Sequence, residues 1–284
     1  MPPLVGRWEP VYDPTNGYYI DSNSSLWVVD LRNPDAPSTA STVITDDPNG
    51  WWGNMQVVGD TLYTGHYEWV QRPTNGGTSS DWTVRYYADR VDLSDRSSPR
   101  VGAKINIPGL LVGGSPQNPN LLYTIDYRWD SDTAKDDFDV VEVQGGRAVL
   151  ISTTTLDGWV GSTFVRGTTA YVSAQQYTDP NNGGTGSTVQ LHAIDLTNPN
   201  APVDRASAAA QGWGWLLDVE GDRAVVMSGW GPNGVDIYQL TPGQPPQFRQ
   251  FTRTLGWWSN GVSRQGNSLY LSSGYWGVQK VDLQ

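Results

Sequence analysis

A short motif that recurs along this chain limits the folds it can adopt. The motif is a polar and usually acidic residue between two apolar residues. Six copies lie 43 to 62 residues apart, counted between their last residues. Prolines follow most copies, which is typical of turns between strands because proline lacks a backbone donor and fixes φ. The copies end at Leu31, Leu93, Val143, Leu196, Leu240 and Leu283.

Two further columns repeat in step with this motif. A mostly aromatic column lies upstream of each copy, and a second column, Trp in four of six copies, precedes it by 12 residues. Glycine-containing pairs such as Gly59-Asp60 fall between the two columns and suit tight hairpin turns. The aromatic column reads Tyr19, Tyr63, Tyr123, Tyr171, Val225 and Tyr270, and the earlier one reads Arg7, Trp51, Leu111, Trp159, Trp213 and Trp258.

Each repeat therefore predicts four strands. In the second repeat they are expected near residues 53–58, near 61–65, up to the motif at Leu93, and at 101–107. Four-stranded units of about 45 residues are the signature of a β-propeller, and no segment shows helical periodicity. The sequence predicts an all-β, six-bladed propeller of four-stranded antiparallel blades in a single domain, 1–284.

The last repeat stops at its motif without a fourth strand, whereas the chain begins with prolines and the segment Leu4–Arg7. We therefore expect the N-terminal strand to complete the last blade and close the propeller, which would pair an otherwise exposed edge. The expected blades are approximately 9–50, 51–109, 110–157, 158–211, 212–255, and 256–284 together with 1–8.

The segment from Leu26 to Pro37, which reads LWVVDLRNPDAP, resembles the LVIVD-type repeat of secreted bacterial and archaeal β-propellers. The segments Val91–Ser94, Pro99–Gly102 and Ile107–Gly109 resemble the related "beta propeller domain" family. The resemblance covers nearly the whole chain, blade by blade. It implies a secreted, periplasmic or cell-surface location and carries over no catalytic residue, because these repeats are structural.

Composition excludes several classes of function. The chain has 284 residues, a net charge of −11 and no cysteine, so disulfides and thiolate chemistry are absent. An acidic chain with few lysines is a poor nucleic-acid binder, and no apolar run is long enough for a membrane-spanning helix. The expected partner is a protein, peptide or glycan.

The candidate site is a tryptophan-rich rim. In a four-stranded blade, the turn between the first and second strands and the turn between the third and fourth strands lie on the same rim. Here those turns are short, so that rim offers few side chains for binding. Longer aromatic segments gather on the other rim, where loops on a rigid scaffold commonly carry function. The sequence thus predicts a non-catalytic binding or interaction module. For the repeated Trp column, recurrence at a fixed position of the repeat favours packing between blades. The predicted ligand-binding residues are Trp52, Tyr67, Trp69, Tyr127, Trp129, Trp230, Tyr275 and Trp276, with His66 and Asp126 as polar anchors.

The alternative is a propeller enzyme, a hydrolase or lyase acting on a saccharide or peptide, with His66 and Asp126 at the channel mouth. The other histidine, His192, is expected to be packed within a strand. No cofactor and no metal site are predicted. Acidic segments around Asp130, Asp132, Asp136 and Asp137 offer oxygen ligands that calcium prefers, but such segments are usually solvated turns.

Overall fold

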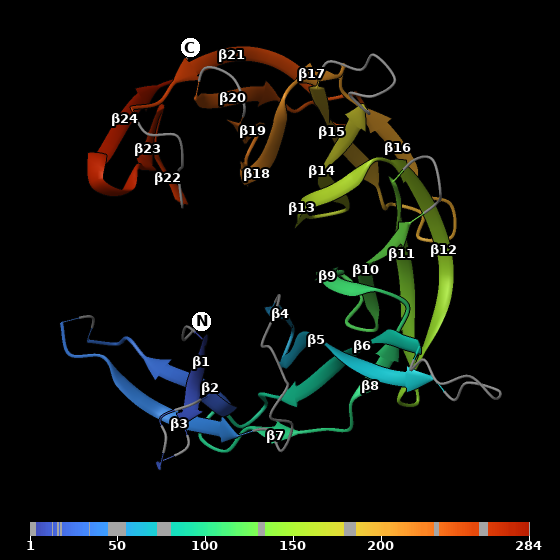
Figure 1. The fold of residues 1–284 in the computed structure, drawn as a ribbon, viewed down its shortest axis with the longest axis vertical. Helices are drawn as coiled ribbons and strands as arrows, with labels where there is room; N and C mark the ends of the chain where they lie inside the picture. Colours follow the sequence, from blue (N-terminus) through green and yellow to red (C-terminus); the bar gives the residue numbers. More distant parts are fainter. Residues whose placement is uncertain are drawn as a thin grey trace. The chain divides into compact units, whose positions relative to one another are not determined.

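The computed structural model describes residues 4–12, 14–15, 17, 19–33, 35–44, 55–72, 81–129, 134–178, 186–229, 233–255 and 261–283. In these residues the regular structure is β-strand, apart from one short 3-10 turn, η2 (Gly274–Trp276). The strands form six antiparallel sheets that follow one another in chain order (Figure 1). The all-β prediction is confirmed. Four of the six sheets have the expected order of four antiparallel strands, and the other two have three strands in the described residues.

The six sheets are named first to sixth in chain order. The first contains β1 (Leu4–Tyr12), β2 (Tyr19–Asp30) and β3 (Ser38–Ile44), and the second contains β4 (Met55–Val58), β5 (Thr61–Arg72), β6 (Asp81–Asp92), β7 (Arg100–Val101) and β8 (Ile105–Ile107). The third contains β9 (Leu110–Gly114), β10 (Leu121–Trp129), β11 (Ala134–Gln144) and β12 (Arg147–Asp157). The fourth contains β13 (Trp159–Arg166), β14 (Thr169–Thr178), β15 (Gly186–Asp195), β16 (Val203–Ala206) and β17 (Ala210–Gln211). The fifth contains β18 (Trp213–Glu220), β19 (Arg223–Gly229), β20 (Gly234–Gln239) and β21 (Gln247–Arg253), and the sixth contains β22 (Gly261–Gln265), β23 (Ser268–Ser272) and β24 (Val278–Asp282).

Internal contacts divide the chain into two compact units, Met1–Ile125 with Asp139–Ile151, and Asp126–Phe138 with Ser152–Gln284. In the first unit, Tyr63, Ile107, Leu111 and Leu122 belong to one buried cluster. In the second unit, buried clusters lie on both faces of the fifth sheet, one including Val226 and Tyr238 and the other Val225 and Ile237. Successive strand residues alternate between these faces, as a sheet buried on both sides requires.

The repeated motif has a structural role. Its acidic residue accepts a hydrogen bond from the backbone N–H two residues later: Ser94 N to Asp92 Oδ1 is 2.9 Å, and Thr197 N to Asp195 Oδ1 is 3.0 Å. This local bond begins the turn to the fourth strand. The last motif residue donates its N–H to the first–second turn of the same sheet, as from Leu93 to Asp60 O at 2.8 Å. In the second and fourth sheets, where both bonds are present, the motif therefore ties together two turns on one side of the sheet.

The prediction that Leu4–Arg7 completes the last blade is wrong. These residues lie in β1, which pairs with β2 from Leu4 opposite Val28 onward, and the sixth sheet contains β22, β23 and β24. A hairpin of adjacent strands closes a short loop at little entropic cost. Gly17, in the connection, has a φ of +71°, which glycine adopts without strain.

The second correction concerns strand lengths. We expected the second strand of the second repeat to end near Gly65, with Tyr67–Pro73 in a rim loop. Instead β5 continues to Arg72 and pairs residue by residue with β6. Aromatic and β-branched residues in both strands favour this extension, with Tyr67 opposite Tyr86 and Trp69 opposite Val84.

Candidate functional site

The candidate site lies on the ribbon formed by β5 and β6, each of which has 12 residues. The neighbouring strands are much shorter: β4 pairs only with Thr61–Thr64, and β8 only with Tyr86–Ala88. In the described part of the chain, the outer end of the ribbon therefore has two strands alone. Side chains there face outward from both sides of the ribbon.

One face of the ribbon carries an aromatic corner, formed by Tyr67 and Trp69 with Tyr86 beside them. The Tyr67 and Trp69 rings meet edge to face, with centroids 6.5 Å apart and an interplanar angle of 86°. Tyr67 also meets Tyr86 at a centroid distance of 6.5 Å. Tyr67 is 41% exposed and Trp69 is 63% exposed. Two nearly perpendicular aromatic rings are thus exposed to solvent side by side.

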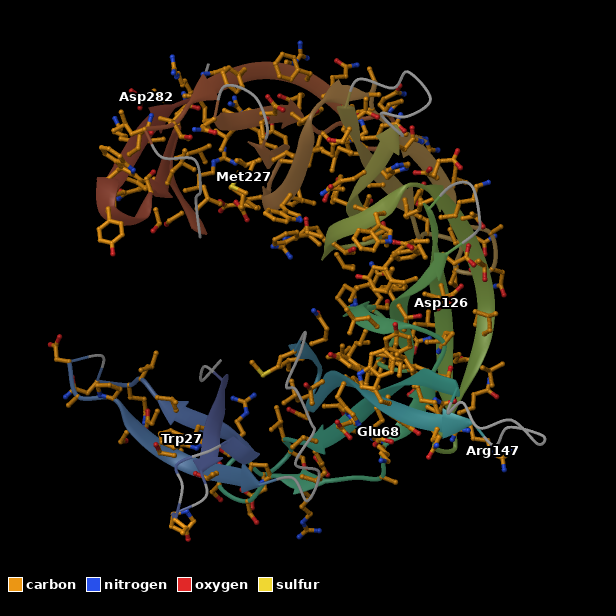
Figure 2. The ribbon with its side chains drawn as sticks, in the orientation of Figure 1. Trp27, Glu68, Asp126, Arg147, Met227 and Asp282 are labelled. Carbon is orange, nitrogen blue, oxygen red and sulfur yellow. The ribbon has the colours of Figure 1, made fainter. Side chains whose placement is uncertain are left out.

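The opposite face carries a charged layer of His66, Glu68, Asp89 and Lys104, with Tyr87 beneath it (Figure 2, where Glu68 is labelled). His66 is 3% exposed, its Nδ1 lies 2.5 Å from Asp89 Oδ2, and its Nε2 lies 3.6 Å from Glu68 Oε1. The His66 ring stacks on Tyr87 at a centroid distance of 5.3 Å.

Lys104 completes this layer. Its Nζ pairs with Glu68 and lies 4.7 Å from the centroid of the Tyr87 ring. The Glu68–Lys104 ion pair, the His66–Asp89 contact and the ring stacking fix side chains of β5, β6 and the segment just before β8 relative to one another. The layer therefore braces the ribbon that carries the aromatic corner.

The remaining predicted ligand-binding residues fall into three groups. Trp52 and Trp230 lie outside the described residues, and Trp129 ends β10. Asp126 and Tyr127 lie in β10 and are partly buried. Tyr275 is fully exposed in η2, and its neighbour Trp276 is 65% exposed. The structure thus brings Tyr67 and Trp69 together in the first unit and places Tyr275 and Trp276 in the second.

Other aromatic and histidine residues are packed. Trp215, on β18, lies against Gly161 of β13, where an added Cβ would come within 2.8 Å of its ring. His192 is buried, with Nδ1 2.9 Å from Asp204 Oδ2. Trp159 is partly buried at the start of β13, whereas Trp51 and Trp258 lie outside the described residues. Packing accounts for Trp215 and His192 without a ligand.

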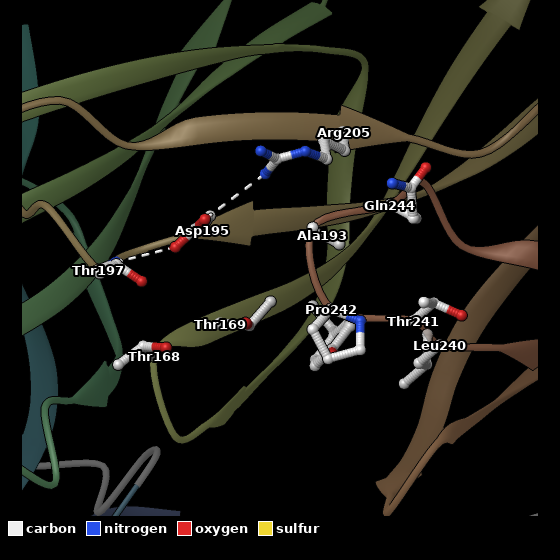
Figure 3. Close-up of a pocket in the computed structure, with 12 residues that line it drawn as sticks. Thr168, Thr169, Ala193, Asp195, Thr197, Arg205, Leu240, Thr241, Pro242 and Gln244 are labelled. Carbon is white, nitrogen blue, oxygen red and sulfur yellow. Dashed lines mark hydrogen bonds and ion pairs between the residues drawn. The ribbon is translucent and has the colours of Figure 1, made fainter.

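Sequence reasoning missed a pocket of about 120 Å³ between the fourth and fifth sheets (Figure 3). It is lined by turn residues such as Thr168 and Pro242, on the side predicted to be plain. Asp195 lines it too, 3.7 Å from Arg205, and hydrogen bonds from Thr197 hold the pKa of Asp195 below its usual value. The signal in the sequence was the motif aspartate itself, which serves both the turn and the pocket.

The candidate calcium segment is only partly described. Asp130 and Asp132 lie outside the described residues. Asp136 accepts a hydrogen bond from Val160 N at 2.7 Å, and Asp137 accepts one from Thr155 Oγ1 at 2.7 Å. Among the described residues no cluster of three or more His, Asp or Glu side chains is arranged to hold a metal ion. Within the same residues, no helix has the length and apolar character needed to cross a membrane.

The sequence matches no protein-family model and no curated protein. Among solved structures, hydrazine synthase from Kuenenia stuttgartiensis is similar, with a TM-score of 0.56 and 14% identity over 92% of this chain and 80% of that one. A putative 6-phosphogluconolactonase from Bacteroides fragilis aligns at a TM-score of 0.39 and 9% identity, over 98% of this chain and 90% of that one. The second similarity is too low to support an argument. The first shows the fold alone, and with the six successive sheets it defines the chain as a β-propeller.

Proposed function

We propose that this chain is a non-catalytic, extracytoplasmic recognition module whose aromatic corner binds a neutral saccharide of a glycan. The single observation that carries the proposal is the exposure of two adjacent large aromatic side chains, Tyr67 and Trp69, on a ribbon braced from its other face. The extracytoplasmic location rests on the resemblance to secreted propellers described above.

The chemistry of the corner favours a sugar ring. An indole and a phenol at right angles can cover one apolar face and one edge of such a ring, while their N–H and O–H groups remain available to hydroxyls. Gln71 follows Trp69 by two residues, so it lies on the same face of β5 and adds an exposed amide. The net charge of −11 disfavours anionic ligands.

The test is isothermal titration of the full chain with neutral gluco-, xylo-, manno- and N-acetyl-oligosaccharides. At least one should bind, and Trp69→Ala should weaken that binding by tenfold or more, since central aromatic contacts dominate binding energy. Trp276→Ala is the matched control because Trp276 is equally exposed but lies in η2. Equal affinities of wild type and Trp69→Ala, or no binding across the panel, would overturn the proposal.

The enzyme alternative is tested in the same samples. A hydrolase or lyase using His66 would release shortened or unsaturated products, and His66→Ala would abolish them. The burial of His66 beneath Glu68 and against Tyr87 favours a bracing role instead. We therefore expect His66→Ala to weaken saccharide binding without any product being formed in wild type.

A further inference from the structure

The outer strand of the fifth sheet, β21, has an open edge. The sheet runs β18-β19-β20-β21, and in the described part of the chain β21 pairs only with β20. Its sequence is QFRQFTR, and most of its residues are exposed. An open edge strand offers unpaired backbone N–H and C=O groups, which natural proteins usually shield.

A bulge places two phenylalanines on one face of this strand. Phe248 lies opposite Tyr238, and Phe251 lies opposite Asp236, with a register shift between these pairs. Because Tyr238 and Asp236 share a face of β20, both rings point to the same side. Each ring is supported from below: Phe248 meets Tyr238 edge to face at 5.9 Å, and Phe251 packs over Gly234. The rings nevertheless remain 54% and 39% exposed.

The charge of this strand is opposite to that of the chain. The chain has 29 acidic and 18 basic residues, yet residues 241–255 contain Arg249 and Arg253 and no acidic residue. Neither arginine forms an ion pair with any residue that the structure describes. The Arg249 guanidinium donates to Gln247 Oε1 at 3.4 Å, within the same strand. Two guanidinium groups that have no carboxylate partner among the described residues, beside exposed aromatic rings, complement a ligand that is both acidic and apolar.

We propose that the open edge of β21 binds an extended acidic peptide of a partner protein, which adds as a further strand to the fifth sheet. Backbone hydrogen bonds supply affinity in this mode, and alternate side chains supply specificity. Apolar side chains of the peptide cover Phe248 and Phe251, and its carboxylates pair with Arg249 and Arg253. This surface belongs to the fifth sheet and the aromatic corner belongs to the second, so a result against one proposal does not refute the other.

The pocket between the fourth and fifth sheets is lined by Leu240 to Gln244, the segment that leads into β21 (Figure 3). Leu240, which lines it, follows Tyr238 by two residues and belongs with it to one buried cluster. The volume of about 120 Å³ suits one side chain of a bound peptide rather than a large ligand. A peptide along β21 can therefore place an apolar or hydroxyl side chain there.

The probe is a fluorescently labelled ten-residue peptide in which Glu alternates with Val and Phe, measured by anisotropy against the full chain. Two comparison peptides replace every Glu by Lys or insert two prolines, which remove ladder donors. We expect saturable binding of the Glu peptide alone, weakening as salt rises. The double variant Arg249→Glu/Arg253→Glu should lower its affinity by about tenfold or more, because charge-assisted contacts become repulsive.

The matched control is Arg100→Glu, an exposed arginine on the short edge strand β7. It should leave peptide affinity unchanged, and circular dichroism checks that all variants are folded. Three results would overturn the proposal: no saturable binding of the Glu peptide by wild type, equal binding of the Lys peptide, or equal loss in Arg100→Glu and the double variant. Self-association of the free chain that the double variant abolishes would assign the edge to a second copy instead.

Discussion

Replacing Gly65 by alanine tests how the ribbon is anchored. Gly65 lies in β5, one residue before His66, and faces β9 of the third sheet. A Cβ at this position would lie 2.8 Å from Leu111 Cβ and 3.4 Å from Leu111 N. Leu111 is completely buried. Because the close contacts involve Cβ and the backbone of Leu111, no change of its rotamer relieves them.

The magnitude follows from two opposing effects. Forcing an extra methyl group into a packed core costs about 1–3 kcal/mol. Alanine also restricts the unfolded chain more than glycine does, which stabilises the folded state by about 0.4–1 kcal/mol. We therefore expect Gly65→Ala to lower the free energy of unfolding by about 1–2 kcal/mol.

The measurement is urea unfolding followed by far-ultraviolet circular dichroism, in which the midpoint falls while the slope m stays constant. Gly261→Ala is the control, because an added Cβ there meets nothing within 4 Å. It should leave stability unchanged or raise it slightly. If Gly65→Ala and Gly261→Ala unfold at the same midpoint, the face-to-face packing of β5 on β9 is refuted.

Three further predictions concern the motif and the second unit. Asp195→Ala removes the acceptor for Thr197 N and should lower the free energy of unfolding in urea by about 0.5–1 kcal/mol. Asp195→Asn keeps an acceptor and should lower it by less. Equal losses in the two variants would contradict the role of this turn. Burial raises the pKa of Asp236, which accepts a hydrogen bond from Ser228, so the stability of the folded chain should fall as pH rises above 3.8. Asp236→Asn should melt at a higher temperature than wild type at pH 7 and at the same temperature at pH 3. A difference that does not depend on pH would refute this. Burial and the nearby Asp236 raise the pKa of Tyr238 from 10.0 to about 12, so its contribution is intact below pH 10 and about 2 kcal/mol is lost by pH 12. Tyr238→Phe should lack this loss in denaturant titrations, and an identical alkaline profile would exclude it.

The order of the sheets could be predicted from the sequence because the relevant signals are local. The Asp92 and Asp195 turns, and the buried motif leucines that follow them, belong to a motif that recurs every 43 to 62 residues, and they mark where the third strands of their sheets end. The Gly145-Gly146 pair is also local: both residues have positive φ and form the tight turn between β11 and β12. Local hydrogen bonds and turn conformations leave a direct trace in residue order.

The partner of the N-terminal strand could not be predicted from its resemblance to a fourth strand. The pattern of Leu4–Arg7 indicates that a strand forms but does not say which edge it joins. The signal that distinguishes the two outcomes is Asn16-Gly17, a pair that favours hairpins and connects β1 to β2. The N-terminal strand pairs with β2, the next strand in the sequence, and not with a strand of the last repeat.

The two-faced character of the ribbon also depends on contacts that spacing does not reveal. Tyr67 and Trp69 were predicted as binding residues in a loop, but their edge-to-face geometry follows from strand pairing with β6. His66 meets Asp89 and Glu68 meets Lys104, at sequence separations that no repeat indicates. Likewise, the charge of β21 is visible in the sequence, whereas its open edge is visible only in the sheet order.

The most direct test of the proposed recognition site is hydroxyl-radical footprinting with mass spectrometry, with and without the neutral oligosaccharide that binds in titration. We predict that the saccharide lowers oxidation of Tyr67 and Trp69 by severalfold and leaves Tyr275 and Trp276 as reactive as in the free chain. Unchanged oxidation of Tyr67 and Trp69 at saturating saccharide would contradict the assignment of the aromatic corner as the binding site.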